Sequence, residues 1–433
     1  MNELDLTLEI THEQEGQYLT LPFQLPEGTE RLELSIRYEG RVEQALEGGM
    51  QGSRDVTVID TGLIDPRGMQ VGYSGSIRNE IYLSATEATP GYQARTLIPG
   101  EWRILAGLYR VAPEGATVHY HLRFVSKHLR LLLGDLHTHS YNSDGVLSPE
   151  ELARHARRHG LDFVALTDHN QFSTAATLPS EPGLSMIAGT EWTTYQGHAN
   201  FLGVDEPFTG SFFADDLAGV QAIFQQAHEN GALITLNHPL EEPWALHVPM
   251  EALVWDCLEV WNGPMRSANL RTLELWHSML AAGQRVVMCS GSDYHRDSPF
   301  EMLGGPTLCV YSASPDPADI LAGVRAGLSY AVFGPHGPRL TLAVGELLPG
   351  QTAGWRDHRT LHVALEGLAA DDRIRALSGS GELLCVEAAS DGCWQGDVPV
   401  PEPDFVRIQV DRCFAPGLPH LPALLSNAVW LEG

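Results

Sequence analysis

The first part of the chain alternates apolar and polar residues in short runs. Every second residue is Leu or Ile in 4–10 and again in 32–36, which places the apolar side chains on one face of an extended segment. Pro and Gly interrupt the sequence at 26–28 and 90–91. Short strands at this spacing predict an antiparallel β-sandwich, an accessory domain that covers residues 1–128.

The pattern changes after residue 129, where apolar strand-like runs alternate with stretches of helical period. Helices are expected near 148–160, 216–230, 268–282 and 316–326. Ser148 and Glu151 complete an S-x-x-E capping box around Pro149, which marks the start of the first helix. Repeated βα units of this length predict a largely parallel sheet that can close into a barrel over 129–337.

Strand-like patterning returns after residue 338, for example in RLTLAV at 339–344 and DFVRIQV at 404–410. We therefore expect a smaller β-rich domain over 338–433. The predicted fold class is a multidomain α/β and β protein, in which the α/β part is flanked by a β-domain on each side.

Composition and charge narrow the class of protein. A chain of 433 residues is long enough for two or three domains. Its formal net charge of -28 argues against binding long nucleic acid, because such binding uses Lys and Arg to neutralise phosphates. The six cysteines form no CxxC pair, and neither a signal peptide nor a transmembrane segment is expected. We expect a cytoplasmic protein that does not bind membranes.

Candidate chemistry gathers where the predicted strands of the middle region end. The side chains concerned are imidazoles and carboxylates: His137, His139, Asp144, His169, Glu191, His198, His238, Asp293 and His295. The C-terminal ends of parallel strands are where such barrels place their active sites. Residues i and i+2 of a strand point the same way, so His137 and His139 can bind one ion together.

Imidazole and carboxylate ligands suit Zn, Mn and Fe ions. Glu191 is the candidate for a carboxylate that bridges two ions.

Six short motifs follow one another over about 131–335: D-L-H-x-H-S, S-D-G, T-D-H-N, G-H, N-H-P and S-D-x-H. This order of motifs resembles the PHP (polymerase and histidinol phosphatase) family. The resemblance implies a distorted (β/α)7 barrel with up to three metal ions, and it implies the following ligands. The first ion takes His137, His139, Glu191 and Asp293. The second shares Glu191 and adds His198 and His238. The third takes Asp144, His169 and His295. Three such ions would bring six positive charges, and Asp144, Glu191 and Asp293 would return three negative ones. The positive remainder favours an anionic substrate, and in particular the charge that develops during phosphoryl transfer.

A narrower resemblance rests on the segments GDLHTHSYNSDG, EWTTYQGHANFLG, LEVWNG and SGSDYH. These segments are similar to the carbaryl-hydrolase-like (CehA/McbA) group of PHP proteins, whose members often carry an N-terminal β-domain. We therefore expect a metal-dependent hydrolase that binds two to three divalent ions.

Several residues are predicted to support the metal ligands. Asp135, Asp168, Asn170 and Asn237 are candidates for orienting the histidine rings, and Asp168 is equally a candidate for capping a turn. For gripping a phosphate, the candidates are Arg266, Arg271 and Arg296. The residues predicted to carry catalysis are Glu191, Asp293, His295 and Arg296.

The leading hypothesis is a phosphoesterase that acts on a small anionic substrate, a phosphodiester or phosphomonoester, through a hydroxide held between metal ions. The alternatives are a carbamate, carboxyl ester or amide hydrolase, a nucleotidase or exonuclease, and a non-enzymatic binding scaffold. A homo-oligomer is possible. The ligand set by itself does not separate a phosphoesterase from a carbamate, carboxyl ester or amide hydrolase.

Overall fold

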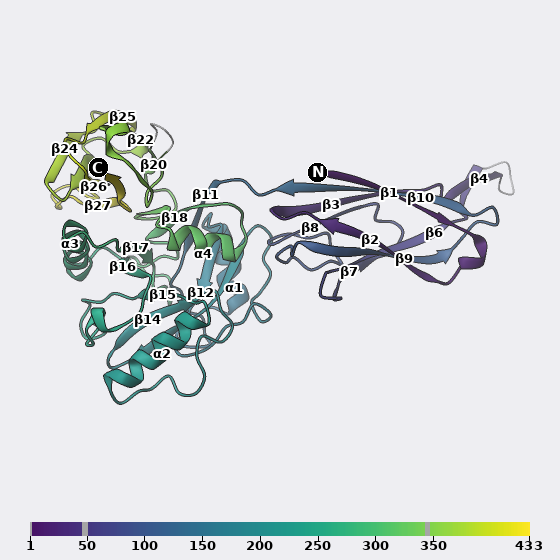
Figure 1. Cartoon of the computed structure of the whole chain (residues 1–433), viewed down its shortest axis with the longest axis horizontal. Helices are drawn as coiled ribbons and strands as arrows, with labels where there is room; N and C mark the ends of the chain where they lie inside the picture. The colour runs from purple at the N-terminus through teal and green to yellow at the C-terminus, as the bar shows by residue number, and fades with distance from the viewer. Residues whose placement is uncertain (1, 46–50, 343–346) are drawn as a thin grey trace. The chain divides into compact units, whose positions relative to one another are not determined.

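The computed structural model describes residues 2–45, 51–342 and 347–433. The chain divides into two compact units, Met1–His128 and Leu129–Gly433 (Figure 1). The predicted boundary after residue 128 coincides with this division. The predicted third domain, 338–433, is part of the second compact unit, and its separateness stays a prediction.

The first unit consists of two four-stranded antiparallel sheets and a β-hairpin. One sheet has the order β1 (Glu3–Ile10), β10 (Ala116–Ser126), β3 (Thr29–Arg37) and β8 (Glu80–Ser84). The other has the order β2 (Tyr18–Leu25), β9 (Gly100–Arg110), β6 (Val58–Ile64) and β7 (Gln70–Ser74). The hairpin pairs β4 (Arg41–Ala45) with β5 (Gln51–Asp55).

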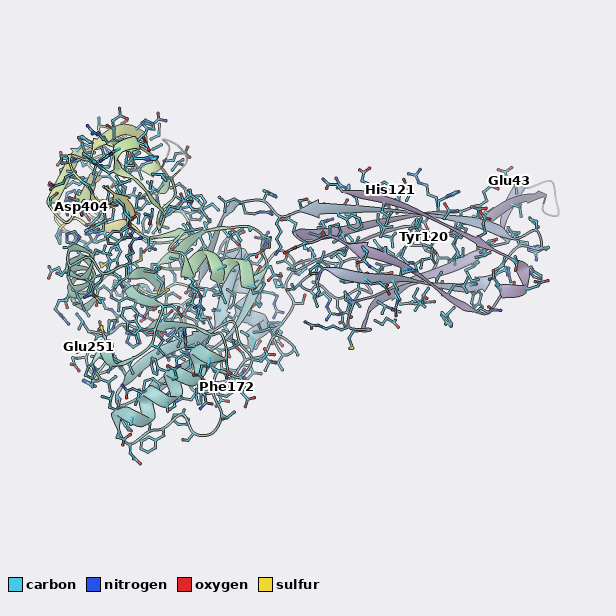
Figure 2. All side chains as sticks on the ribbon, in the orientation of Figure 1. Glu43, Tyr120, His121, Phe172, Glu251 and Asp404 are labelled. Atoms are coloured by element: carbon cyan, nitrogen blue, oxygen red, sulfur yellow. The ribbon has the colours of Figure 1, made fainter. Side chains whose placement is uncertain are left out.

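Both sheets contribute to a single apolar core, because successive side chains of a strand point to opposite faces. Figure 2 labels two neighbours on β10 that show this alternation. Tyr120 is buried in the core, whereas His121 points outward and bonds Asp5 at 2.8 Å. The alternation that predicted strands in this unit therefore also determines which face of each sheet is buried.

The second unit is built on a long mixed sheet. Its first seven strands have the order β17 (Val287–Gly291), β16 (Cys257–Asn262), β15 (Leu233–Leu236), β14 (Gly197–Leu202), β13 (Ser185–Thr194), β12 (Phe163–Leu166) and β11 (Arg130–Asp135). The sheet continues through β18 (Thr307–Ser312) and β19 (Ser329–Val332), both antiparallel to their neighbours.

The sheet is parallel in two blocks, β11–β12–β13 and β15–β16–β17, with antiparallel β14 between them. The expectation of a largely parallel sheet is met in these blocks but not at β14. Only Tyr195 and Gln196 separate β13 from β14. A two-residue connection makes a hairpin, since a parallel crossover needs a dozen or more residues.

In the described part of this unit four α-helices accompany the strands, at the four places where the sequence predicts helices. They are α1 (Pro149–Arg158), α2 (Leu217–Glu229), α3 (Ser267–Ala281) and α4 (Pro317–Arg325). The capping box at the start of α1 is confirmed: the Glu151 amide donates to Ser148 Oγ at 3.1 Å, and the Ser148 amide donates to Glu151 Oε2 at 2.9 Å. In the part of the chain that the structure describes, no helix is long and apolar enough to cross a membrane.

The C-terminal strands extend the same sheet. From β19 it passes to β27 (Leu421–Ser426), β26 (Asp404–Arg412), β23 (Arg373–Ser378) and β24 (Gly381–Glu387). A separate sheet contains β20 (Arg339–Leu342), β22 (Thr360–Leu368) and β25 (Gly392–Pro399), and β21 (Thr352–Gly354) pairs with β28 (Val429–Glu432). Residues 343 and 344 of the strand predicted at 339–344 lie outside the described residues.

Candidate metal centre

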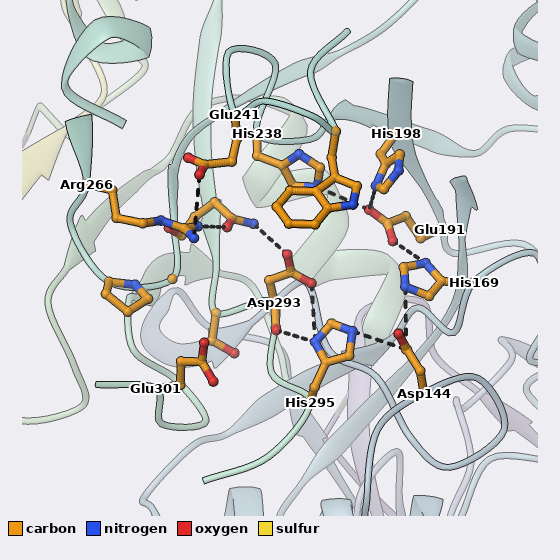
Figure 3. Close-up of a pocket in the computed structure, with 15 residues that line it drawn as sticks. Asp144, His169, Glu191, His198, His238, Glu241, Arg266, Asp293, His295 and Glu301 are labelled. Atoms are coloured by element: carbon orange, nitrogen blue, oxygen red, sulfur yellow. Dashed lines mark hydrogen bonds and ion pairs between the residues drawn. The ribbon is translucent and has the colours of Figure 1, made fainter. Parts of the chain in front are cut away.

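All nine predicted ligands lie at one end of the mixed sheet of the second unit. His137 and His139 follow β11, and Glu191 lies near the end of β13. Asp293 and His295 follow β17. Figure 3 shows Glu191, Asp293 and His295 around one cavity, so residues far apart in the sequence meet where the parallel strands end.

The Glu191 carboxylate is the centre of the arrangement. It is fully buried, and five imidazoles approach it. Oε1 lies 3.2 Å from His137 Nε2, 3.2 Å from His198 Nδ1 and 3.5 Å from His238 Nε2. Oε2 lies 2.7 Å from His169 Nδ1 and 3.6 Å from His139 Nε2. A carboxylate with ring nitrogens on both oxygens has the geometry of a bridging ligand.

Two aspartates complete the cluster. Asp293 Oδ1 lies 3.0 Å from His139 Nε2 and 3.3 Å from His137 Nε2. Asp144 Oδ1 lies 3.1 Å from His295 Nε2 and 3.4 Å from His169 Nε2. Asp144 lies in the loop after β11, whereas Asp293 and His295 lie in the loop after β17, so two loops meet here (Figure 3).

Four overlapping groups of these residues have ligand atoms within 4.8 Å of one another. They are His139, Asp144, His169 and His295; His137, His238 and Asp293; His137, His139 and Glu191; and Glu191, His198 and His238. Every predicted ligand belongs to at least one group. His238 belongs to two groups, so it can pair with either Asp293 or Glu191.

The donor atoms fit divalent cations. His137 Nε2, His139 Nε2 and His198 Nδ1 are buried, face the carboxylates and make no hydrogen bond within the described chain. Buried polar atoms are nearly always hydrogen-bonded, and unprotonated ring nitrogens are good ligands for Zn, Mn and Fe. Metal ions would satisfy these nitrogens and balance the buried carboxylates together.

The ionisation of the cluster follows from this crowding. Burial opposes charge on His137, but Asp293, Glu259 and Glu191 outweigh burial and raise the pKa of His137 well above its usual value. Burial also opposes charge on Glu191, and His137 with the other rings still holds the pKa of Glu191 well below its usual range. For His139, burial dominates and lowers the pKa.

The backbone is unusual at the same place. Of the four non-glycine residues with positive φ in the described chain, three are Asn170 (50°), His238 (28°) and Asp293 (53°). Such conformations cost free energy and concentrate at functional sites. Gly291 is constrained too, because a Cβ there would lie 2.3 Å from His137 Cβ. The close approach of β17 to His137 therefore requires glycine.

Glu259, on β16, is a residue of the site that the sequence analysis did not single out. Its Oε1 is 2.9 Å from His137 Nδ1, and its Oε2 accepts from the His238 amide at 2.9 Å. It therefore orients the ring of one ligand and the backbone of another. The available signal was an acidic residue within CLEVWN, a strand whose six residues are all buried.

The predicted supporting residues contact groups other than the histidine rings. Asp168 accepts from the Ser140 amide and hydroxyl and from the Ser143 hydroxyl, so it anchors the loop after β11. Asn170 bonds the backbone of Thr193.

Asp135 and Asn237 also bind groups other than the rings. Asp135 accepts from the amides of His137, Ser292 and Gly304, and burial raises the pKa of Asp135 to about 6. Asn237 donates to Glu191 Oε1 at 2.8 Å. These four polar residues hold backbone segments and the Glu191 carboxylate, and Glu259 orients the His137 ring.

A cavity of about 240 Å³ opens beside the cluster. Arg266 lines it, and Arg266 Nη2 donates to Asn262 Oδ1 at 2.8 Å. Arg271 instead donates to the Leu240 carbonyl, and Arg296 is exposed and lies outside the cavity lining among the described residues. The catalytic role assigned to Arg296 stays a prediction.

Part of this region is similar to known proteins. Residues 135–242 match the PHP domain, a segment that includes seven of the nine predicted ligands and ends before Asp293 and His295. A 5'-3' exoribonuclease of Haemophilus influenzae is 43% identical over 63 residues, which are 14% of this chain and 23% of that protein. The chain thus matches less than a quarter of the length of this relative.

Two solved structures are similar at low identity. A two-domain Bacteroides vulgatus protein, described as containing a predicted PHP-like metal-dependent phosphoesterase, aligns at 15% identity and a TM-score of 0.40. The alignment covers 68% of this chain and 95% of that one. A predicted metal-dependent phosphoesterase of Bifidobacterium adolescentis aligns at 19% identity and a TM-score of 0.31, over 43% of this chain and 95% of the other.

Proposed function

We propose that the protein is a metal-dependent phosphoesterase that hydrolyses small phosphate esters. The observation that carries the proposal is the set of nine imidazole and carboxylate side chains centred on Glu191. Five of them are buried, namely His137, His139, Glu191, His198 and His238, and several ring nitrogens have no other partner among the described residues. The match of residues 135–242 to the PHP domain supports it independently.

The proposed centre holds three divalent ions. His137, His139, Glu191 and Asp293 would bind the first, with Glu191, His198 and His238 on the second and Asp144, His169 and His295 on the third. When bound, such ions lower the pKa of water and polarise phosphoryl oxygens. Mn, Zn and Fe suit the ligands equally.

The protein's own residues have positioning roles. Asn262 holds Arg266 Nη2 and also donates to Asp293 Oδ2 at 3.3 Å, so one amide connects the guanidinium to a metal ligand. A guanidinium fixed in this way would bind an anionic oxygen of the substrate through paired N–H donors.

The test is the turnover of an aryl phosphodiester, an aryl phosphomonoester and an aryl carbamate by the Mn-loaded protein. We expect turnover of a phosphate ester, and a loss of at least about a hundredfold in kcat/KM for Asp293→Ala, because this change removes a ligand. Turnover of the carbamate alone would contradict the proposal. It would favour the carbaryl-hydrolase-like alternative, which stays a prediction. The cytoplasmic location also stays a prediction.

Exonuclease or nucleotidase activity is the second candidate, and the local identity to the exoribonuclease favours it. The net charge of -28 and the acidic lining of the cavity work against a long polyanion. A short RNA and a mononucleotide added to the same assay separate the two candidates.

A further inference from the structure

The loop after β15 connects a metal ligand to the wall of the cavity. His238, Glu241 and Trp244 follow one another at three-residue intervals, and all three line the cavity. The Glu241 amide donates to the His238 carbonyl at 2.9 Å, and the Trp244 amide donates to the Glu241 carbonyl at 2.8 Å. Successive turns therefore place Glu241 at a defined distance from the ligand.

The Glu241 carboxylate is incompletely paired. Its side chain is 20% exposed, and Oε1 lies 3.8 Å from Arg266 Nη1, beyond hydrogen-bond distance. Oε2 is buried and has no hydrogen-bond partner in the described parts of the chain. A buried carboxylate oxygen without a donor is costly, and the exposed part of the same carboxylate lines the cavity, so Glu241 is an acceptor for a ligand group.

The rest of this wall indicates what kind of group fits. Besides the predicted ligands, the charged side chains that line the cavity are Glu241, Glu301 and Arg266, so their net charge is negative. Trp244 is 53% exposed and offers an aromatic surface. A negative wall disfavours a second phosphate and favours hydrogen-bond donors.

Figure 3 shows Glu241 and Arg266 across the cavity from Glu191 and His169. A phosphate bound between the candidate metal ligands and Arg266 would therefore leave the alcohol portion of the ester beside Glu241. At about 240 Å³ the cavity is smaller than the roughly 300–1,000 Å³ of typical ligand sites, which suits a small molecule.

We propose that Glu241 is a specificity-determining residue that accepts a hydrogen bond from a hydroxyl group on the alcohol portion of the substrate. This inference rests on the proposed function, because the phosphate end of the ester must bind at the metal centre. The substrate class is then a phosphate ester of a small polyhydroxylated alcohol. An ester whose alcohol carries no donor leaves the Glu241 carboxylate unpaired and is selected against.

The experiment compares glycerol phosphate with propyl phosphate, which has the same three-carbon chain without the hydroxyls. For the Mn-loaded protein, we expect kcat/KM to favour glycerol phosphate by about tenfold or more, the range for leaving a buried acceptor unpaired. In Glu241→Ala the ratio should fall to within about threefold of one. Glu242→Ala is the matched control, because the Glu242 side chain is 71% exposed, and it should retain the preference.

Calorimetric binding of the two phosphonate analogues, dihydroxybutylphosphonate and butylphosphonate, provides a second measurement that does not need turnover. Tighter binding of dihydroxybutylphosphonate than of butylphosphonate, lost in Glu241→Ala, supports the inference. This holds even if neither ester is hydrolysed, although the proposed function then fails. Equal rates for both esters in the wild type, or equal losses for both in Glu241→Ala, would overturn the inference. Equal losses for both esters in Glu241→Ala would mean that Glu241 only orients Arg266, and the proposed function would stand.

Discussion

Glu191 shows at the scale of single residues how the centre is organised. It receives five imidazoles, the Asn237 amide and the Thr193 hydroxyl, and these neighbours compensate its burial. Removing either partner of such a pair leaves the other unpaired in a buried place. Substitutions within this cluster are therefore expected to act mainly on metal binding.

Glu259 provides a prediction at this scale. Glu259→Gln keeps the volume of the side chain but weakens the hold on His137 Nδ1 and on the His238 amide. Loss of such an outer partner costs roughly 10- to 100-fold in metal affinity, and we expect a decrease of this size in competition with a chelator. Glu251→Gln, an exposed glutamate in the same unit, is the control. Equal affinities for the two variants would refute the positioning role.

Single elements bring the ligands to their places. The loop that carries Asp144 is bounded by β11 and by the capped start of α1. Gly145 allows this loop to pass close to His139, since a Cβ at Gly145 would lie 2.4 Å from the His139 carbonyl oxygen. The β13–β14 hairpin places Glu191 opposite Asn200, so the antiparallel strand β14 is part of the site.

The cap of α1 provides a prediction at this scale. Ser148→Ala removes the acceptor of the Glu151 amide, and loss of such a cap costs about 1 kcal/mol. Hydrogen exchange in the first turn of α1 should then be about fivefold faster, which mass spectrometry measures. Ser148→Thr retains the oxygen and should exchange like the wild type. Equal exchange in the Ala and Thr variants would show that packing alone holds the helix start.

For the whole molecule, metal binding and the stability of the Leu129–Gly433 unit are expected to be coupled. The ligands come from both parallel blocks of the sheet, so ions that bind the folded state join segments far apart in the chain. A ligand present at a hundred times its Kd stabilises the folded state by about 2.7 kcal/mol. Chelation should therefore lower the Tm of this unit.

Acidification should also lower the Tm of the Leu129–Gly433 unit, because it weakens metal binding. The metal-free protein has a raised pKa at His137, His169 and His238: burial opposes their charge, and nearby carboxylates outweigh it. Protons therefore compete with metal already above the ordinary imidazole value of about 6.5, and the affinity falls as the pH decreases through the raised pKa values. Dialysis from about pH 8 to about pH 5, with metal content and Tm measured at each step, tests this. Unchanged metal content across that range would contradict it.

Local physics in the sequence determined the elements and pointed to the candidate ligands. Alternation predicted the strands of the first unit, helical periodicity predicted all four helices, and the capping box predicted where α1 begins. These features depend on neighbours within a few residues, as does the placing of imidazoles and carboxylates at strand ends. The local pattern therefore predicted most residues of the candidate site.

The tertiary structure decided what depends on residues far apart in the chain. It showed that β14 runs antiparallel, that C-terminal strands continue the sheet through β19, and that Glu259 holds His137. It also placed Arg266 in the cavity lining and left Arg296 exposed. Strand neighbours, burial and pairing across more than a hundred residues are set by packing of the whole sheet, which no local pattern encodes.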